Sequence, residues 1–253
     1  MGNNSNTHEA PVALITGSAQ RIGAAITRML HELGYNTIIH YRHSASSAQK
    51  LASELNGIRK NSAASVAADL NDHQSILNLA ETAVGIWGRI DVLINSASSF
   101  YPTPIGSATE LQWDELVNSN MKAPFFLSQA LAPALARQKG AIINIADIYA
   151  EKPLAQHTIY CMAKAGNAML TKSLAMELAP MIRVNGIAPG AILWPDQGGA
   201  NEEQAQTKLL EKIPLGRTGL QEDIANTVVF LLRNAPYITG QIISVDGGRT
   251  LNI

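Results

Sequence analysis

Seven short apolar runs alternate with longer segments of helical periodicity, and this alternation constrains the fold more than any other feature of the sequence. The runs have strand length and cover residues 12–16, 37–40, 65–68, 92–95, 141–145, 183–187 and 241–245. The segments between them favour helices at residues 21–33, 45–56, 73–87, 111–136, 156–179 and 221–233. Such alternation predicts an α/β fold, a doubly wound parallel sheet with helices on both faces.

Composition favours one well-packed domain and excludes several classes of partner. The chain has 253 residues, of which 46% are hydrophobic and 15% charged. A net charge of −1 gives no reason to expect nucleic acid or an anionic membrane as partner. The single cysteine, Cys161, cannot form an intrachain disulfide, which fits a reducing compartment. We expect a disordered tail at residues 1–10, one domain at 11–253, no metal site and a cytoplasmic location.

The first strand runs into a glycine-containing turn that opens a helix. Gly17 and Gly23 stand where a backbone must come close to a ligand, and the helix N-terminus suits a pyrophosphate. Arg21 occupies a position where many such turns carry glycine. The alternative interpretation is an ordinary tight connection between a strand and a helix.

The end of the second strand bears on the choice of cofactor. An acidic residue there would bind the ribose 2′-hydroxyl of NAD. This chain instead has Tyr41, Arg42, His43 and Ser44, with no carboxylate. Basic and hydroxyl groups suit a 2′-phosphate, which Arg21 can also reach, so the sequence favours NADPH. A solvated basic loop would explain the charges but not the missing acid.

The end of the third strand admits two interpretations. Asp69 and Leu70 stand where they can meet an adenine ring. An N-cap role for Asp69 or Asn71 is an equally simple explanation.

Small residues end the fourth strand and follow the sixth. Asn95 and Ala97 fall at the carboxyl end of a strand, where an open parallel sheet binds ligands. Phe100 offers either a flat face for a ring or an ordinary core side chain. Pro189 and Gly190 can form a wall beside a nicotinamide.

A tyrosine and a lysine lie one helical turn apart. Tyr160 and Lys164 share a helix face, where an ammonium close to a phenol would lower the phenol pKa. Asn120 lies within a predicted helix, where asparagine is disfavoured, and can serve as a backbone or water ligand close to Lys164.

Together these features resemble the short-chain dehydrogenase/reductase family over almost the whole chain. The matching motifs are residues 16–23, Asn95 to Ala97, Asn120, Tyr160 with Lys164, Pro189 with Gly190, and 246–248. The resemblance implies a single-domain Rossmann fold. It also implies a set of residues that bind NADPH. They are Gly17, Arg21, Ile22, Tyr41, Arg42, His43, Ser44, Asp69, Leu70, Asn95, Ala97, Ser98, Tyr160, Lys164, Pro189 and Gly190.

One departure narrows the resemblance. Most members carry serine thirteen residues before the tyrosine, and this chain has Asp147 there. A carboxylate would repel a developing alkoxide, but a carboxyl group can pass protons to a ring nitrogen. With the intact segment 97–104, this makes the chain similar to the pteridine reductase branch. The His and Arg order at 42–43 and Ser96 differ from that branch.

The resemblance implies roles for the catalytic residues. A pterin would stack between Phe100 and the nicotinamide, with Ser98 on its amino and oxo edge. Tyr160 would give a proton to the nitrogen beside the carbon that receives hydride. Lys164 would hold the nicotinamide ribose and lower the tyrosine pKa, and Asp147 would orient or feed the tyrosine. Asn120, the fourth catalytic candidate, would connect the lysine to solvent through water.

Two other functions are compatible with the sequence. The motifs indicate the substrate ring but not the group attached to it. A carbonyl reductase of the 3-oxoacyl-carrier-protein reductase type would share the fold, and an idle NADPH-binding regulator belongs to another class. Pterins, their dihydro forms and dihydrofolate share one ring. The segment 194–207 is expected to form a lid. The resemblance also implies a homotetramer that uses helices 111–136 and 156–179 and the last strand.

Overall fold

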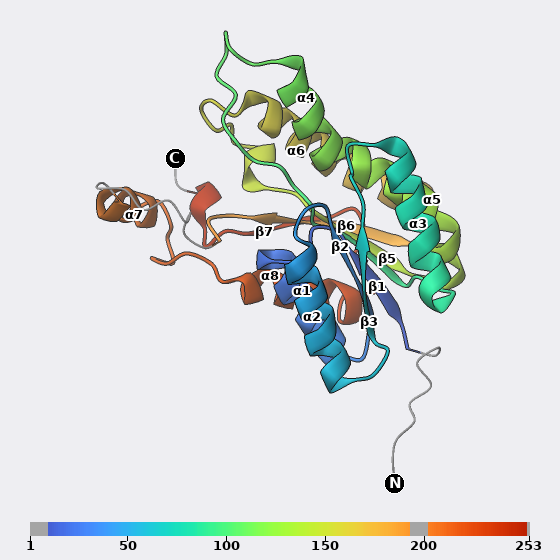
Figure 1. Cartoon of the computed structure of the whole chain (residues 1–253). Helices are drawn as coiled ribbons and strands as arrows, with labels where there is room; N and C mark the ends of the chain where they lie inside the picture. Colours follow the sequence, from blue (N-terminus) through green and yellow to red (C-terminus); the bar gives the residue numbers. More distant parts are fainter. Residues whose placement is uncertain (1–9, 193–201, 252–253) are drawn as a thin grey trace.

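The computed structural model describes residues 10–192 and 202–251, which form a seven-stranded parallel sheet covered by helices (Figure 1). The strand order is β3-β2-β1-β4-β5-β6-β7. The strands are β1 (Val12–Ile15), β2 (Asn36–Tyr41), β3 (Ala63–Ala67), β4 (Val92–Asn95), β5 (Ala141–Ile145), β6 (Arg183–Pro189) and β7 (Ile242–Val245). The predicted doubly wound α/β fold is confirmed.

Helices cover both faces of this sheet. One face carries α1 (Arg21–Glu32), α2 (Ala45–Ile58) and α8 (Gln221–Arg233); the other carries α3 (His73–Trp87), α5 (Ala123–Arg137) and α6 (Thr158–Leu178) (Figure 1). The helix α4 (Glu110–Val117) packs against α6. Except for the segment 111–136, the predicted strands and helices agree with the structure to within two residues at each end.

Two hydrophobic cores lie on the two faces of the sheet, and the central strands contribute side chains to both. In β1, Val12 and Leu14 pack with the core under α3, α5 and α6, whereas Ala13 and Ile15 pack under α1 and α8. All four side chains are completely buried. Burial on both faces explains why the strands read as continuous apolar runs without alternation.

The segment 111–136 is helical along its whole length, as predicted, but it is not α-helical throughout. A π-helical turn, Asn118–Lys122, separates α4 from α5. Pro124 has no N–H to donate to the carbonyl of Asn120, four residues earlier. Asn167 of α6 donates its side-chain amide to that carbonyl instead, at 2.9 Å. The widened turn therefore points Asn120 toward α6 and the strand ends, as π-turns at functional sites often do.

The order of the strands creates a crevice. β1 pairs with β2 on one side and with β4 on the other, so the crossovers leave β1 in opposite directions. Ligands bind outside the carboxyl ends of strands at such a switch point. The loops after β1, β2, β4, β5 and β6 meet at this edge.

Two expected segments fall wholly or partly outside the described residues. Of the predicted tail at 1–10, the structure describes only Ala10. The predicted lid at 194–207 lies outside the description up to residue 201, and its remainder belongs to α7 (Glu202–Leu210), which was not predicted. Within residues 10–192 and 202–251, no helix is long and apolar enough to span a membrane. The same ranges contain no cluster of His, Cys, Asp or Glu suited to a metal ion.

The contact between α6 and the π-helical turn predicts a stability effect. Asn167→Ala leaves the buried carbonyl of Asn120 without its donor, so the free energy of unfolding should fall by about 1–3 kcal/mol. Urea unfolding at one fixed protein concentration measures this. Asn78→Ala, the same change at an exposed position of α3, is the control and should stay within about 0.5 kcal/mol of the parent protein. Equal values for the two variants would contradict the assigned role.

Candidate active site

Glycines in the turn after β1 allow its backbone to lie close to other backbone segments. Gly17 has φ +62°, and a Cβ there would lie 2.8 Å from the Cα of Ala97. A Cβ on Gly23 would lie 2.5 Å from the carbonyl oxygen of Gly17. The Thr16 hydroxyl accepts from the backbone N–H groups of Ser96 and Ala97 at 2.9 and 3.0 Å. The turns after β1 and β4 are thereby fastened together at the switch point.

A buried histidine that was not predicted as a site residue supports this turn. His40 accepts at Nδ1 from the N–H of Gly17 at 3.0 Å and donates from Nε2 to the carbonyl of Ala68 at 3.1 Å. Burial lowers the pKa of His40 to about 4, so the imidazole stays neutral. A histidine within a strand is usually interpreted as a core residue, so the sequence offered little sign of this role. The one available signal was the position of His40 near the end of β2.

A pocket of about 490 Å³ opens at this edge of the sheet. Most of the predicted cofactor residues line it. They are Gly17, Arg21, Ile22, Tyr41, Arg42, His43, Ser44, Ser98, Tyr160, Lys164, Pro189 and Gly190. The pocket has the tight glycine turn at one end and buried polar side chains at the other, which fits an elongated dinucleotide.

Four predicted cofactor residues do not line the pocket. Asn95 donates its amide to Asn144 at 2.8 Å inside the core, and Leu70 is buried under the sheet. Ala97 packs against Gly17. Asp69 accepts from the N–H of Asn71 at 3.0 Å.

The alternative N-cap interpretation for this loop is wrong. Asp72 caps α3, because its carboxylate accepts from the N–H of Ser75 at 2.7 Å. Asp69 and Asn71 precede the helix and form an Asx-type turn instead.

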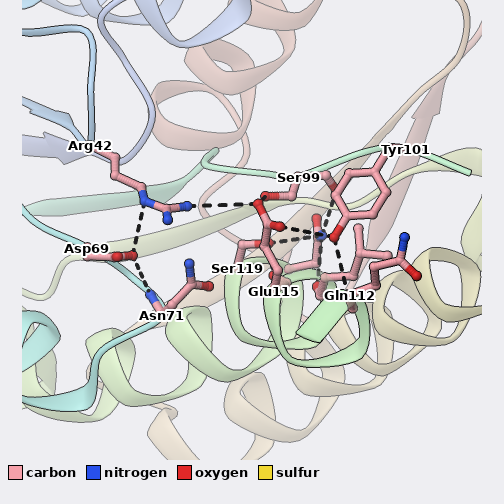
Figure 2. Close-up of polar contacts among 10 residues, drawn as sticks. Arg42, Asp69, Asn71, Ser99, Tyr101, Gln112, Glu115 and Ser119 are labelled. Atoms are coloured by element: carbon pink, nitrogen blue, oxygen red, sulfur yellow. Dashed lines mark hydrogen bonds and ion pairs between the residues drawn. The ribbon is translucent and has the colours of Figure 1, made fainter. Parts of the chain in front are cut away.

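The two arginines expected at the 2′-phosphate differ in their settings. Arg21 opens α1 at φ +54°, the left-handed region that glycine adopts without strain, which explains why glycine is common at this position. Arg42 pairs with Asp69 at 3.3 Å and with Glu115 at 3.9 Å while also lining the pocket (Figure 2).

At the other end of the pocket, Tyr160 and Asp147 are directly bonded. The Tyr160 hydroxyl donates to Oδ2 of Asp147 at 2.7 Å, and Oδ1 accepts from the N–H of Tyr149 at 2.9 Å. Lys164 donates to the carbonyl of Ile145 at 2.9 Å, with Nζ 5.7 Å from the centre of the Tyr160 ring. Helix α6 and the loop after β5 thus bring the predicted tyrosine, lysine and aspartate together.

The electrostatics of this group correct one expectation. Burial and the Asp147 carboxylate raise the pKa of Tyr160 well above 10, and Ser98 opposes them only in part. The prediction that the phenol pKa falls below its ordinary value is therefore wrong, and the contribution of Lys164 to that pKa stays a prediction. Burial also lowers the pKa of Lys164 to about 8, against the pull of Asp147, because a charged amine is poorly solvated there.

Burial acts on the aspartate too. It raises the pKa of Asp147, although hydrogen bonds from Tyr149 and Tyr160 and the nearby charges of Lys164 and Arg249 oppose the rise. Both pKa values are raised, so the Asp147 carboxyl takes up a proton more readily than an ordinary aspartate, and the Tyr160 hydroxyl stays protonated. This arrangement can deliver a proton into the pocket through the tyrosine.

Asn120 bonds to the segment after β4, and no direct bond joins it to Lys164 among the described contacts. Its Oδ1 accepts from the Ser98 hydroxyl at 2.7 Å, and its amide donates to the carbonyls of Ser99 and Leu116, each at 2.9 Å. The structure holds Ser98 in place in this way. The water-mediated link from Asn120 to Lys164 stays a prediction.

Phe100 is not a core residue. Its side chain is 53% exposed, and its ring stacks on His157 at 4.7 Å with an interplanar angle of 16°. The edge contact with Tyr160, 4.8 Å between ring centres, places Phe100 beside the phenol. Stacking against a substrate ring stays a prediction.

Comparison with known proteins assigns the chain to a family. A family model described as enoyl-(acyl carrier protein) reductase matches residues 17–250. Pteridine reductase 1 of Leishmania tarentolae is 38% identical, over 96% of this chain and 97% of the relative. The 3-oxoacyl-acyl-carrier-protein reductase FabG of Staphylococcus aureus is 36% identical, over 93% of this chain and 96% of the relative.

The chain therefore belongs to the short-chain dehydrogenase/reductase family, as the motifs predicted. It is an oxidoreductase that uses a nicotinamide cofactor. Relatives of two kinds, a pteridine reductase and 3-oxoacyl reductases, are almost equally similar to it. Overall identity does not show which of the two kinds of substrate this chain uses. The residues of the site have to decide between them.

The buried lysine predicts a pH-dependent stability. Below about pH 8 Lys164 is protonated in both states, and the folded state bears the cost of a buried charge. Between about pH 8 and 10 the unfolded chain binds more protons, so stability rises with pH. Lys164→Met should therefore unfold at higher urea than the parent protein at pH 7, and this advantage should shrink toward pH 9.5. Lys50→Met, at an exposed position, is the control, and a constant Lys164→Met advantage would contradict the assignment.

Proposed function

We propose that the protein is an NADPH-dependent pteridine reductase, which reduces oxidised or dihydro pterins, and dihydrofolate as a further candidate, to tetrahydro forms. The observation that carries the proposal is the 2.7 Å hydrogen bond from Tyr160 to Asp147, at the position where most members of the family have serine. The similarity to a pteridine reductase supports it.

A buried carboxyl beside the tyrosine suits a C=N bond better than a ketone. A ketone that receives hydride becomes an alkoxide, which a neighbouring carboxylate would repel. A C=N group needs a proton at nitrogen, and a carboxyl with a raised pKa can resupply the phenol that gives it. Asp147 is therefore matched to a nitrogen substrate.

The proposed step divides between the cofactor and the chain. When bound, NADPH would supply the hydride for the ring carbon of the C=N bond. Tyr160 donates its hydroxyl proton to the adjacent nitrogen, and Asp147 or solvent returns a proton to the phenolate. Lys164, whose Nζ donates to the carbonyl of Ile145, would hold the nicotinamide ribose. Ser98, fixed by Asn120, binds the amino and oxo edge of the pterin while Phe100 stacks on its ring.

The preference for NADPH rests on the basic loop after β2. Arg21, Arg42, His43 and Ser44 line the pocket at that end, and no acidic residue stands at the end of β2 to bind a 2′-hydroxyl. We place the enzyme in the cytoplasm and its NADP-binding domain at residues 11–253.

Carbonyl reduction is the rival function, favoured by the 36% identity to FabG. Oxidation of NADPH and of NADH with dihydrobiopterin, dihydrofolate and an acetoacetyl thioester, side by side, separates the two. We expect pterin turnover with NADPH. Thioester turnover without pterin turnover would make the protein a carbonyl reductase, and tight NADPH binding without any turnover would make it an idle regulator.

Asp147 provides the sharper test. Asp147→Ser should lower kcat/KM for the pterin by about 10²–10⁴-fold, the usual contribution of general acid–base catalysis, and should raise turnover of the thioester. Glu151→Gln, an exposed carboxylate close by in the chain, is the matched control. Full pterin turnover by Asp147→Ala would contradict proton supply through the carboxyl.

The outer face of α6 supports the proposed homotetramer. Met162, Met169 and Met176 stand seven residues apart on this helix and are 52%, 63% and 87% exposed. A line of exposed apolar side chains indicates an interaction surface. We expect light scattering to give four protomers for the parent protein and fewer for Met169→Glu. Gln49→Glu, on α2 at the other sheet face, should leave the assembly intact, and a monomeric parent protein would contradict the proposal.

A further inference from the structure

Glu115 lies outside the pocket lining and has no role in the proposed reaction, yet it contacts three groups. Its Oε1 lies 3.9 Å from a guanidinium nitrogen of Arg42 and accepts from the Ser99 hydroxyl at 3.4 Å. Its Oε2 accepts from the Tyr101 hydroxyl at 3.0 Å (Figure 2). One carboxylate of α4 thus touches both the basic loop after β2 and the segment after β4.

Arg42 is shared between carboxylates and the pocket. Its Nε pairs with Asp69 at 3.3 Å, and its guanidinium reaches Glu115 only at 3.9 Å. The side chain is 40% exposed and also lines the pocket. A phosphate dianion binds arginine with shorter, charge-assisted bonds than a carboxylate at that distance. An incoming 2′-phosphate would therefore compete with Glu115 for Arg42.

The other partners of Glu115 belong to the substrate wall, the segment from Ser98 to Tyr101. Asn120 holds this segment from inside, through Ser98 and the carbonyl of Ser99. Glu115 holds it from outside. Burial and Glu115 raise the pKa of Tyr101 to about 12, so its hydroxyl remains a donor to Glu115 at neutral pH.

We propose that Glu115 is a positioning residue that couples the phosphate end of the cofactor site to the substrate wall. When a 2′-phosphate binds Arg42, Glu115 loses the most distant of these three partners, and its carboxylate keeps the hydroxyls of Ser99 and Tyr101. The wall is then held more firmly for the substrate. Because coupling between two binding sites is reciprocal, bound substrate favours the phosphate-bearing cofactor to the same degree. The inference rests on the proposed preference for NADPH.

The first measurement tests the phosphate end without any substrate. Calorimetric titration with 2′,5′-ADP should show binding by the parent protein. Glu115→Gln should bind it about two- to five-fold more tightly, the range expected for losing one exposed ion pair. Asp114→Asn removes a neighbouring exposed carboxylate of α4 and is the matched control, with the affinity of the parent protein.

The second measurement tests the coupling. KM for whichever substrate the enzyme turns over, pterin or thioester, is compared with saturating NADPH and saturating NADH. We expect KM to be about two- to five-fold lower with NADPH in the parent protein and in Asp114→Asn, and equal with both cofactors in Glu115→Gln. Tyr101→Phe removes a hydroxyl that would take up the charge of Glu115, so it should raise KM with NADPH, reduce the KM difference between the two cofactors and weaken the binding of 2′,5′-ADP.

Each failure has a separate meaning. If Glu115→Gln keeps the KM difference of the parent protein, or if the parent protein shows none, the coupling is overturned while the proposed function stands. If 2′,5′-ADP does not bind, the NADPH preference fails and the coupling fails with it. Pterin or thioester as the substrate decides the proposed function without affecting either result.

Discussion

The fastening of two loops at the switch point of the sheet is the contact on which the site depends. The Thr16 hydroxyl accepts two backbone N–H groups from the turn after β4, and Gly17 lets the chains meet without a side chain between them. β1 and β4 are neighbours only because the crossovers diverge there. The cofactor turn and the substrate wall are therefore parts of one rigid corner.

A series of hydrogen bonds between buried side chains connects this corner to the substrate wall. Asn95 bonds to Asn144, which bonds to Thr171 of α6. One turn away on the same helix, Asn167 holds the carbonyl of Asn120 that Pro124 leaves free. Breaking any of these bonds would leave a buried polar group without that partner at a cost of about 1–3 kcal/mol, so the bonds favour one arrangement. The Oδ1 atom of Asn167 is itself buried without a partner.

The chemistry of the site follows from burial. The same dry surroundings raise the pKa values of Tyr160 and Asp147 and lower that of Lys164, so each group resists carrying charge. Such a site favours moving a proton along existing hydrogen bonds over holding separated charges. In the proposed reaction, aspartate at position 147 in place of the usual serine favours a nitrogen atom of the substrate as the proton acceptor.

Much of the protein was readable from the sequence alone. Strand and helix alternation determined the sheet, since burial of both faces demands continuous apolar runs, and the motif spacings determined the family and the Tyr160, Lys164 and Asp147 cluster. Only the tertiary structure decided the π-turn at Asn120, the neutral His40 and the rise in the Tyr160 pKa. Those depend on partners distant in the chain and on the loss of solvent. Glu115 carries no sequence signal, because a glutamate on a helix surface is ordinary until the fold brings Arg42 and Tyr101 to it.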